Sequence, residues 1–365
     1  MQNVKKFIKG EIVLVLSFVL AVASCFIVVP NKEYIDYIDF KTLALLFSLM
    51  AVTAGLNKIG VFSLMAEKLL KYVKRFSSLS VVLCLLCFFS SMLITNDVAL
   101  ITFVPFTLII LNLIGRKDKA IILITLETVA ANLGSMATPI GNPQNLYLFS
   151  KYEMGMSDFF SAILPFAAVS LVMVTVWAIF TGKEKVEINR EKTDFKFDAK
   201  IIIYAVLFVI ALLSVFRVVH FLILLGITVV CLLVFDRKIF KDIDYSLLLT
   251  FVFLFVFIGN LGNIPAISNF LKNTVVNREI AVGIISSQVF SNVPAAILLS
   301  NFTENVKALL VGVNLGGLGT LIASMASLIS FKLVAKEGIN VKKYILVFTL
   351  VNVAFLGVNL AVTFI

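Results

Sequence analysis

The sequence predicts an all-α polytopic membrane protein, and three observations support this prediction. Of the 365 residues, 61% are hydrophobic and 14% are charged, whereas globular proteins average about 45–50% and about 25%. The mean hydropathy over the whole chain is +1.07, which a soluble body with one anchor cannot reach because its polar surface lowers the mean. The apolar runs are continuous and do not alternate at period two, which favours helices over a β-barrel.

Runs of about 20 apolar residues can cross a bilayer, and about nine such crossings are expected. They cover 11–29, 40–56, 120–148, 158–181, 200–216, 219–235, 244–260, 305–331 and 344–364. Two other apolar stretches, 77–114 and 279–303, are interrupted by the polar tripeptides 95–97 and 291–293. Unpaired backbone groups are costly in hydrocarbon, so we interpret both stretches as re-entrant hairpins whose tips face protein or water.

The net charge of +10 is interpreted as an orientation signal, because Lys and Arg lie in short loops and form no single stripe for nucleic acid. With the N-terminus in the cytoplasm and both hairpins returning to their side of entry, most Lys and Arg lie inside. This topology places the C-terminus outside, in a cell inner (cytoplasmic) membrane. The four cysteines, Cys25, Cys84, Cys87 and Cys231, lie in apolar runs, and no disulfide framework is expected.

The N-terminus has an alternative interpretation. Lys5, Lys6 and Lys9 precede an apolar run that reaches Cys25, a pattern that a secretory or lipoprotein signal also shows. The run continues beyond Cys25, and the repeat described next requires this helix, so we expect a crossing.

An internal repeat divides the chain. Residues 39–60 align without a gap on 244–265, with Asp39 over Asp244. Each copy continues with a short amphipathic segment, a hairpin, an apolar helix interrupted by Asn-Leu-Gly, and a final crossing. The predicted units are a first inverted repeat 1–182 with a cytoplasmic-side hairpin, a cytoplasmic linker 183–198, a connecting span 199–218, and a second inverted repeat 219–365 with an outer-side hairpin.

Inverted repeats with hairpins and interrupted helices are typical of secondary transporters, so a transporter is the leading functional class. Half-helix N-termini at the bilayer midplane can hold an anion without a buried Lys or Arg, and the free carbonyls suit Na+. Neither hairpin tip carries a basic residue. Helix dipoles, Asn and Ser, with Na+ as the candidate coupling ion, must therefore provide the field around an anionic solute.

The first tip carries Asn96 and Asp97. A carboxylate inside a membrane span is expensive and is a functional candidate, here for Na+ or H+ coupling. The alternative is that Asp97 caps a helix that begins at Val98. Both roles can coexist.

The second tip carries Ser291, Asn292 and Pro294. Pro294 fits the first turn of the second arm, where its missing N–H costs nothing. Asn292 matches Asn96 by repeat position and is expected to contact the solute. Ser291 either contacts the solute or caps the following helix.

Residues 132–145 of the first half contain several amides, two Gly and two Pro, so they cannot continue an ordinary membrane helix. The counterpart is 314–320, where Gly312 and Gly316 are either a helix-packing pair or part of a cavity wall. Glu127 is a second intramembrane acid, either a proton site or a partner of a neighbouring helix.

Several motifs are absent. The sequence has no phosphate-binding G-x-x-x-x-G-K-[ST] loop, and its single histidine, His220 beside Arg217, allows neither a triad nor a zinc cluster. We therefore expect no enzyme, no cofactor and no metal beyond Na+.

The chain resembles the ion transporter superfamily that includes divalent-anion/Na+ symporters, citrate-transporter-like permeases, arsenite efflux permeases and NhaD-type Na+/H+ antiporters. The likeness covers nearly the whole chain and is strongest to small bacterial anion permeases. It is carried by Thr95-Asn96-Asp97 with Pro105, by the run from Asn132 to Asn145 with its Gly-Asn-Pro-Gln-Asn, and by Val289-Phe-Ser-Asn-Val-Pro-Ala295. It implies an elevator-type transporter, usually a homodimer, whose tips and broken helices enclose solute and cations.

The departures from the family pattern affect the solute. The dicarboxylate symporters carry Ser-Asn-Thr at both tips, whereas this chain has Thr95-Asn96-Asp97 and Ser291-Asn292-Val293. Val293 in place of Thr weakens the case for carboxylate recognition there. Asp97 is more similar to the arsenite and antiporter branches.

These observations predict a secondary active transporter of a small anionic solute, a dicarboxylate or inorganic oxyanion, coupled to Na+ or H+ and moving by an elevator mechanism. The alternatives are an antiporter of the arsenite-efflux or Na+/H+ type and, from another class, a channel. The expected partners are a small-molecule anion, the lipid bilayer and a second copy of the chain. The residues expected to bind the solute are Asn96, Asn132, Thr138, Asn142, Ser291, Asn292, Asn314 and Thr320, and those expected at the cation or proton site are Thr95, Asn96, Asp97, Gly134, Asn292 and Gly316.

Overall fold

The computed structural model describes residues 11–61, 64, 73–186 and 198–364, and within them the chain is helical with no strand. A helix satisfies its backbone hydrogen bonds within one segment, so the continuous apolar runs form helices. The helices of the first half are α2 Ile12–Cys25, α3 Phe40–Ile59, α5 Phe76–Ile94, α6 Asn96–Leu113, α7 Ala120–Ser135, α8 Pro143–Lys151 and α9 Met156–Ile179. Those of the second half are α10 Lys200–Val215, α11 Phe221–Phe235, α12 Tyr245–Gly262, α13 Pro265–Val275, α14 Glu279–Phe290, α15 Asn292–Leu299, α16 Val306–Leu315, α17 Met325–Lys336 and α18 Val341–Val362.

Six helices of the described chain are long and apolar enough to cross a membrane, namely α3, α5, α6, α9, α12 and α18. The helices α2, α10, α11, α14 and α16 are apolar but shorter. The fold is therefore that of an all-helical polytopic membrane protein, as the composition predicts. Each predicted crossing coincides with a helix or with a pair of broken helices, and the number of crossings stays a prediction.

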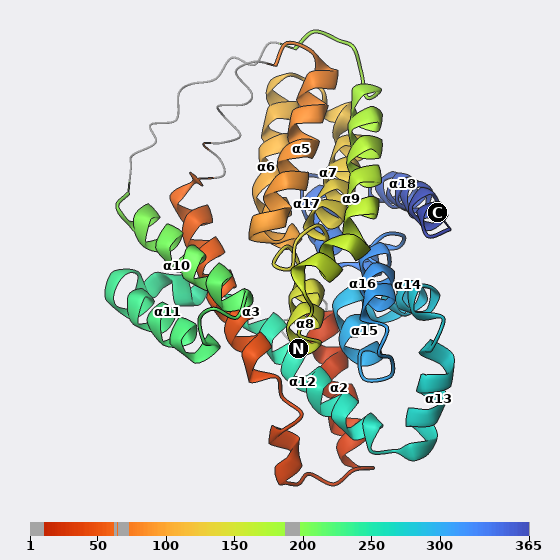
Figure 1. The fold of residues 1–365 in the computed structure, drawn as a ribbon. Helices are drawn as coiled ribbons and strands as arrows, with labels where there is room; N and C mark the ends of the chain where they lie inside the picture. Colours follow the sequence, from red (N-terminus) through yellow and green to blue (C-terminus); the bar gives the residue numbers. More distant parts are fainter. Residues whose placement is uncertain (1–10, 62–63, 65–72, 187–197, 365) are drawn as a thin grey trace, which may run out of the picture.

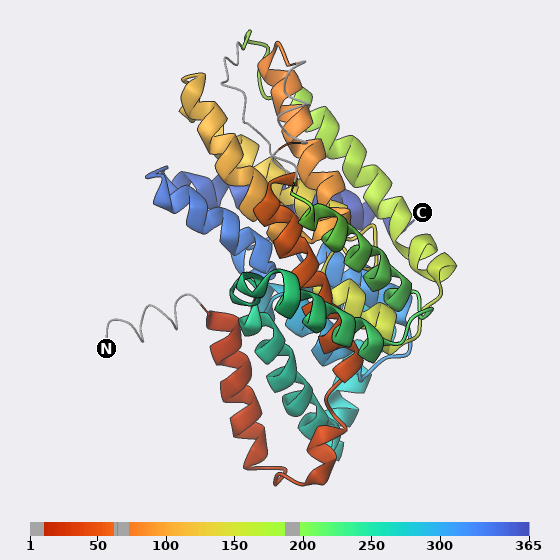
Figure 2. The ribbon, with the colours of Figure 1, turned by 90° about the vertical axis from the view of Figure 1, so that its left-hand side faces the viewer.

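The helices form two groups (Figures 1 and 2). The scaffold group consists of α2, α3, α10, α11 and α12, in which α2 packs along α12 and both α10 and α11 pack on α3. The broken-helix group consists of α5–α9 and α14–α18, in which α5, α6, α7 and α9 stand side by side in Figure 1. The two groups meet where α8 contacts α3 and α15 contacts α12.

The two stretches expected as hairpins are helix pairs, each broken at one residue. The helices α5 and α6 pack together and meet at Thr95, and α14 and α15 pack together and meet at Ser291. Thr95 has φ 71° and ψ 152°, and Ser291 has φ 76° and ψ 155°. These two nearly identical conformations reverse the chain in both halves.

The two aligned aspartates have the same local geometry. Asp39 caps α3 by accepting a hydrogen bond from Thr42 N, and Asp244 caps α12 by accepting one from Leu247 N. Their ψ angles are 84° and 85° with φ −79° in both. The alignment of 39–60 on 244–265 predicts this match.

Two other sequence expectations fall partly outside the described residues. The amphipathic segment of the second half is α13, and most of the corresponding segment after α3 lies outside them. Of the linker 183–198, residues 187–197 also lie outside them. Its beginning pairs with the start of α5, because Phe76 N donates to Glu184 O at 2.9 Å and Val186 N donates to Lys74 O at 3.1 Å.

Candidate functional site

The first hairpin tip is fastened to the break between α7 and α8. Asn96 N donates to Gly141 O at 3.2 Å, and Asn96 Nδ2 donates to Asn132 Oδ1 at 3.0 Å. Thr138 Oγ1 also donates to Met92 O. The tip therefore lies at the middle of the broken helix α7–α8, which the hairpin interpretation requires.

Asn132 joins the two halves of the molecule. Its Oδ1 accepts a hydrogen bond from Ser324 Oγ at 3.1 Å, and its Nδ2 donates to Ser327 Oγ at 3.3 Å. Asn132 lies near the end of α7, whereas Ser324 and Ser327 lie at the start of α17. All three side chains are buried.

Asn314 of the second half makes the reciprocal contacts. Asn142 Nδ2 donates to Asn314 Oδ1 at 3.0 Å, and Asn314 Nδ2 donates to Asn145 Oδ1 at 2.7 Å. Asn142 also caps α8 by accepting from Asn145 N at 2.9 Å. Each interrupted helix is thus bonded, through its last-turn Asn, to the start of the other half's following helix.

The spacing of these residues is the same in both halves. Asn142 and Asn145 follow Asn132 by 10 and 13 residues, and Ser324 and Ser327 follow Asn314 by the same 10 and 13 residues. We call these six residues the inter-half network. Because buried polar groups are costly without partners, the network fixes the two breaks against each other.

The second tip has polar side chains that make no hydrogen bond among the described residues. Ser291 Oγ is buried without a hydrogen-bond partner among the described residues. Asn292 is buried, and its side chain makes no hydrogen bond within the described part of the chain; a Cβ on Gly317 would lie 2.9 Å from its Nδ2. Pro294 lies in the first turn of α15, as its missing N–H predicts. The start of α15 therefore presents a hydroxyl, an amide and free N–H groups.

Asp97 lines a cavity of about 170 Å³ between the first tip and the scaffold group. We call it the Asp97 cavity. Its polar wall consists of Thr53, Thr95, Asp97, Asn142, Asp242 and Asp244, and it contains no Lys or Arg of the described chain. Asp244 is engaged in capping α12, and Asp242 forms an ion pair of 2.9 Å with Lys58. Asp97 Oδ1 is buried and has no partner among the described residues.

Both capping interpretations are wrong in detail. The helix α6 begins at Asn96, not at Val98, and Asp97 lies in its first turn without a capping hydrogen bond. The side chain that bonds to the backbone at this helix start is that of Asn96, whose Oδ1 accepts a hydrogen bond from Asp97 N at 3.0 Å. Ser291 holds the N-cap position of α15 but also makes no capping hydrogen bond. These two side chains are consequently available to other partners.

Four other predicted site residues lie at the edge of this region. Thr138 bonds to α5 as described above, and Thr320 is exposed, with its N–H donating to Gln288 Oε1 at 3.0 Å. A Cβ on Gly134 would overlap Phe88 O, and one on Gly316 would lie 2.5 Å from Ser287 Oγ. The two glycines therefore allow close approach between helices.

Gly312 also lies against a neighbouring helix. A Cβ on Gly312 would lie 2.8 Å from Glu279 O, and one on Gly283 would lie 3.0 Å from the Gly312 carbonyl carbon. Of the two interpretations of the Gly312 and Gly316 pair, this geometry favours helix packing.

Glu127 is fully buried in the broken-helix group, away from the tips. Thr107 Oγ1 of α6 donates to its Oε1, and its Oε2 has no partner among the described residues. The neighbouring-helix interpretation is therefore realised by a hydroxyl, and no basic side chain of the described chain pairs with Glu127.

Sequence reasoning missed three polar groups near the second break: Ser324, Ser327 and Gln288. Gln288 Nε2 donates to Gly316 O and Leu318 O, each at 2.9 Å, so α14 holds the second break open. A signal for the two serines exists, because their spacing from Asn314 repeats that of Asn142 and Asn145 from Asn132.

Comparison with known proteins places the chain. A family model described as "Citrate transporter" matches residues 7–314. The chain belongs to the citrate transporter family. This family member is 36% identical over 336 residues to "Uncharacterized transporter MJ0456" of Methanocaldococcus jannaschii, covering 92% of both chains. It is 29% identical to "Inner membrane protein YbiR" of Escherichia coli over 85% of this chain and 84% of that one.

A shorter match relates this citrate transporter family member to "Silicon efflux transporter LSI3" of Oryza sativa. The two are 32% identical over 142 residues, which is 38% of this chain and 28% of the plant protein. The family and these relatives identify the chain as a membrane transporter, in agreement with its six apolar candidate spans.

Proposed function

We propose that this citrate transporter family member is a secondary active transporter of a small anion, a dicarboxylate or an inorganic oxyanion, coupled to Na+ or H+. The inter-half network is the observation that carries the proposal. Its hydrogen bonds join the first tip to both helix breaks in one buried region, and the second tip lies against the second break at Gly317. Such convergence of discontinuous helices is how secondary transporters build solute and ion sites.

The two tips differ in charge, and we assign them different ligands. The second tip has the Ser291 hydroxyl, without a hydrogen-bond partner among the described residues, and the buried Asn292 at the start of α15, where the helix dipole and free N–H groups favour an anion. The first tip has the carboxylate of Asp97 at the start of α6, and its Oδ1 has no hydrogen-bond partner among the described residues. A carboxylate repels an anion, so Asp97 serves the coupling cation or proton.

The movement that we propose is a rigid-body shift of the broken-helix group against the scaffold group. Two cavities lie between the groups: the Asp97 cavity, and a second of about 490 Å³ that Asp39 and Lys151 help to line. The two N-capping aspartates line different cavities, Asp39 the second and Asp244 the Asp97 cavity. The proposal also includes the orientation, with the N-terminus in the cytoplasm and the C-terminus outside. It includes assembly as a homodimer.

An antiporter of the arsenite-efflux or Na+/H+ type is the second candidate. The observation that favours it is the wall of the Asp97 cavity, which holds three carboxylates and, among the described residues, no Lys or Arg. A cation site of this kind serves exchange as well as symport. A channel would not need two breaks bonded to each other.

The test is uptake into proteoliposomes that contain the purified protein. An imposed inward Na+ or H+ gradient should drive accumulation of labelled succinate, citrate, sulfate or arsenite, with saturable rates. Accumulation that is driven by an outward cation gradient, with the cation leaving as the solute enters, indicates the antiporter. Fast, non-saturable flux that ignores both gradients would indicate a channel and reject secondary transport.

A further inference from the structure

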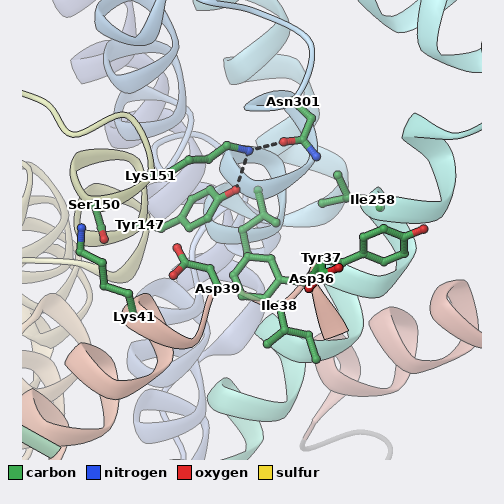
Figure 3. Close-up of a pocket in the computed structure, with 13 residues that line it drawn as sticks. Asp36, Tyr37, Ile38, Asp39, Lys41, Tyr147, Ser150, Lys151, Ile258 and Asn301 are labelled. Carbon is green, nitrogen blue, oxygen red and sulfur yellow. Dashed lines mark hydrogen bonds between the residues drawn. The ribbon is translucent and has the colours of Figure 1, made fainter. Parts of the chain in front are cut away.

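A second polar cavity lies apart from the tips and breaks (Figure 3). It has a volume of about 490 Å³ and lies between residues 36–41 and α12 on the scaffold side and α8 and α15 on the other. We call it the Asp39 cavity. Its volume falls within the range of about 300–1,000 Å³ that small-molecule sites occupy.

Lys151, the last residue of α8, brings a half-buried positive charge to the wall of this cavity. Its Nζ donates to Tyr147 Oη at 3.1 Å, to Ser300 Oγ at 3.0 Å and to Asn301 Oδ1. All three acceptors are neutral, and among the described residues no carboxylate lies within ion-pair distance of Lys151. A partly buried ammonium that no carboxylate contacts directly can take an anion as its direct partner.

Ser150 provides an independent observation. It lines the same cavity, it is 6% exposed, and its Oγ is buried without a hydrogen-bond partner among the described residues. Lys41 also lines the cavity, and its ammonium makes no ion pair within the described chain. Ser150, Lys41 and Lys151 therefore line one space.

The wall also carries two carboxylates, Asp36 and Asp39, which form no ion pair with Lys151 or Lys41 among the described residues, although the negative charges of Asp39 and Glu304 attract Lys151. Asp39 is committed to the N-terminus of α3, where it accepts from Thr42 N at 2.9 Å and from Thr42 Oγ1 at 2.6 Å. Asp36 is exposed at the rim. In Figure 3, Asp39 lies below the side chain of Tyr147, and Lys151 points toward Asn301.

We propose that the Asp39 cavity is a second anion site, which binds a small carboxylate or inorganic oxyanion through Lys151, with Ser150 and Lys41 as further donors. Lys151 follows Asn142 by nine residues along α8, so this site is separate from the inter-half network. The binding does not depend on whether the protein transports the anion. If it does, the cavity loads the anion before it reaches the tips.

The test measures binding of citrate, succinate and sulfate to the detergent-purified protein by isothermal titration calorimetry at pH 7 and constant ionic strength, with chloride as reference. The Lys151→Met variant should lose at least tenfold in affinity, whereas Lys151→Arg should retain most of it. Lys336→Met is the matched control, because Lys336 is an exposed basic residue in the last turn of α17. It should bind like the unaltered protein.

Two further variants separate this site from the central one. Ser150→Ala, which removes only an unpartnered hydroxyl, should weaken binding several-fold and keeps the test open if Lys151→Met does not fold. Asn314→Ala should abolish uptake but leave this binding intact. Unchanged affinity in both Lys151→Met and Ser150→Ala, or loss of all binding in Asn314→Ala, overturns the proposal. Intact binding without uptake in the unaltered protein would contradict the transport proposal only.

Discussion

Asn142 donates a hydrogen bond of 3.0 Å to Asn314, and this contact joins the break of the first half to the interrupted helix of the second. Asn314 also donates to Asn145, so two side-chain hydrogen bonds connect the two breaks directly. The discontinuities of the two halves behave as one polar assembly inside an apolar body.

The contact between Asn142 and Asn314 can be measured by a double-mutant cycle. Asn142→Ala and Asn314→Ala each remove a buried partner, and together they should destabilise the protein by less than the sum of the two. Interhelical hydrogen bonds in membrane proteins have coupling energies of about 0.6 and up to about 1.7 kcal/mol, and we expect a value in this range. Thermal unfolding in detergent is the measurement.

Asn352 gives the matched control for this cycle. It is a buried Asn on α18 whose side-chain hydrogen bond among the described residues stays within its own helix, with Nδ2 donating to Phe348 O at 2.8 Å. Its Ala variant paired with Asn142→Ala should show no coupling. Equal coupling in both cycles would mean that the contact between the two halves has no energetic meaning.

Asp97→Asn should remove the dependence of uptake on the cation gradient. The substitution keeps the volume of the side chain but removes the negative charge that Asp97 brings to the wall of the Asp97 cavity. Asp118→Asn is the control, because Asp118 is exposed in the short 3-10 helix Lys117–Lys119 and pairs with Arg116 at 3.1 Å. Uptake by each variant is compared with and without an imposed Na+ or pH gradient. Normal gradient dependence in Asp97→Asn rejects the coupling role.

Gly134→Ala should destabilise the protein by about 1–3 kcal/mol, because the new Cβ meets the Phe88 backbone. It would overlap Phe88 O, and backbone atoms cannot rotate away. Gly226→Ala on α11 is the control, since nothing lies within 4 Å of its Cβ position. Helix propensity there favours Ala by about 1 kcal/mol. The two midpoints of thermal unfolding should therefore shift in opposite directions.

Anion binding in the Asp39 cavity should weaken as the pH rises above about 8, because Lys151 then loses its charge. Burial lowers the pKa of Lys151 to about 8, against the opposing attraction of Asp39 and Glu304. Burial raises the pKa of Tyr152, so this neighbour stays neutral over the same range. Calorimetric titration with sulfate from about pH 6 to about pH 9 spans this pKa. An affinity that is constant in this window contradicts the assignment to Lys151.

The same pKa fixes the sign of a stability effect. Between the folded value of about 8 and the unfolded value near 10.5, the unfolded chain binds more protons at Lys151. The contribution of Lys151 to stability should therefore rise with pH through this window in the anion-free protein. Lys151→Met should lack that part of the rise.

The sequence predicts the class of fold and the places where the helices break, because polar tripeptides and Pro-Gly clusters cannot continue a helix in hydrocarbon without partners. It does not predict where each helix stops. Asn132, Leu133 and Gly134 remain in α7, and the break begins only at Met136. The reason is a partner from the other half, since Ser324 and Ser327 satisfy the Asn132 side chain inside the helix.

The candidate site is predicted in part. The importance of Asn96, Asn142 and Asn314 follows from rare amides in apolar runs, but Ser324 and Ser327 look like ordinary small residues of a membrane helix. Lys151 has no local signal at all, because a Lys in the last turn of a helix is common. Only the fold of 36–41 and of the loop after α15 against it makes a cavity.

Thr95 and Ser291 both reverse the chain at positive φ, 71° and 76°. Such backbone conformations are almost restricted to glycine and cost about 1–3 kcal/mol for other residues, most for a β-branched one. A chain shaped by stability alone would have glycine at both turns. The hydroxyl that each turn carries is therefore retained at a cost in folding stability. Replacing Thr95 or Ser291 by glycine should yield a more stable protein with lower transport activity.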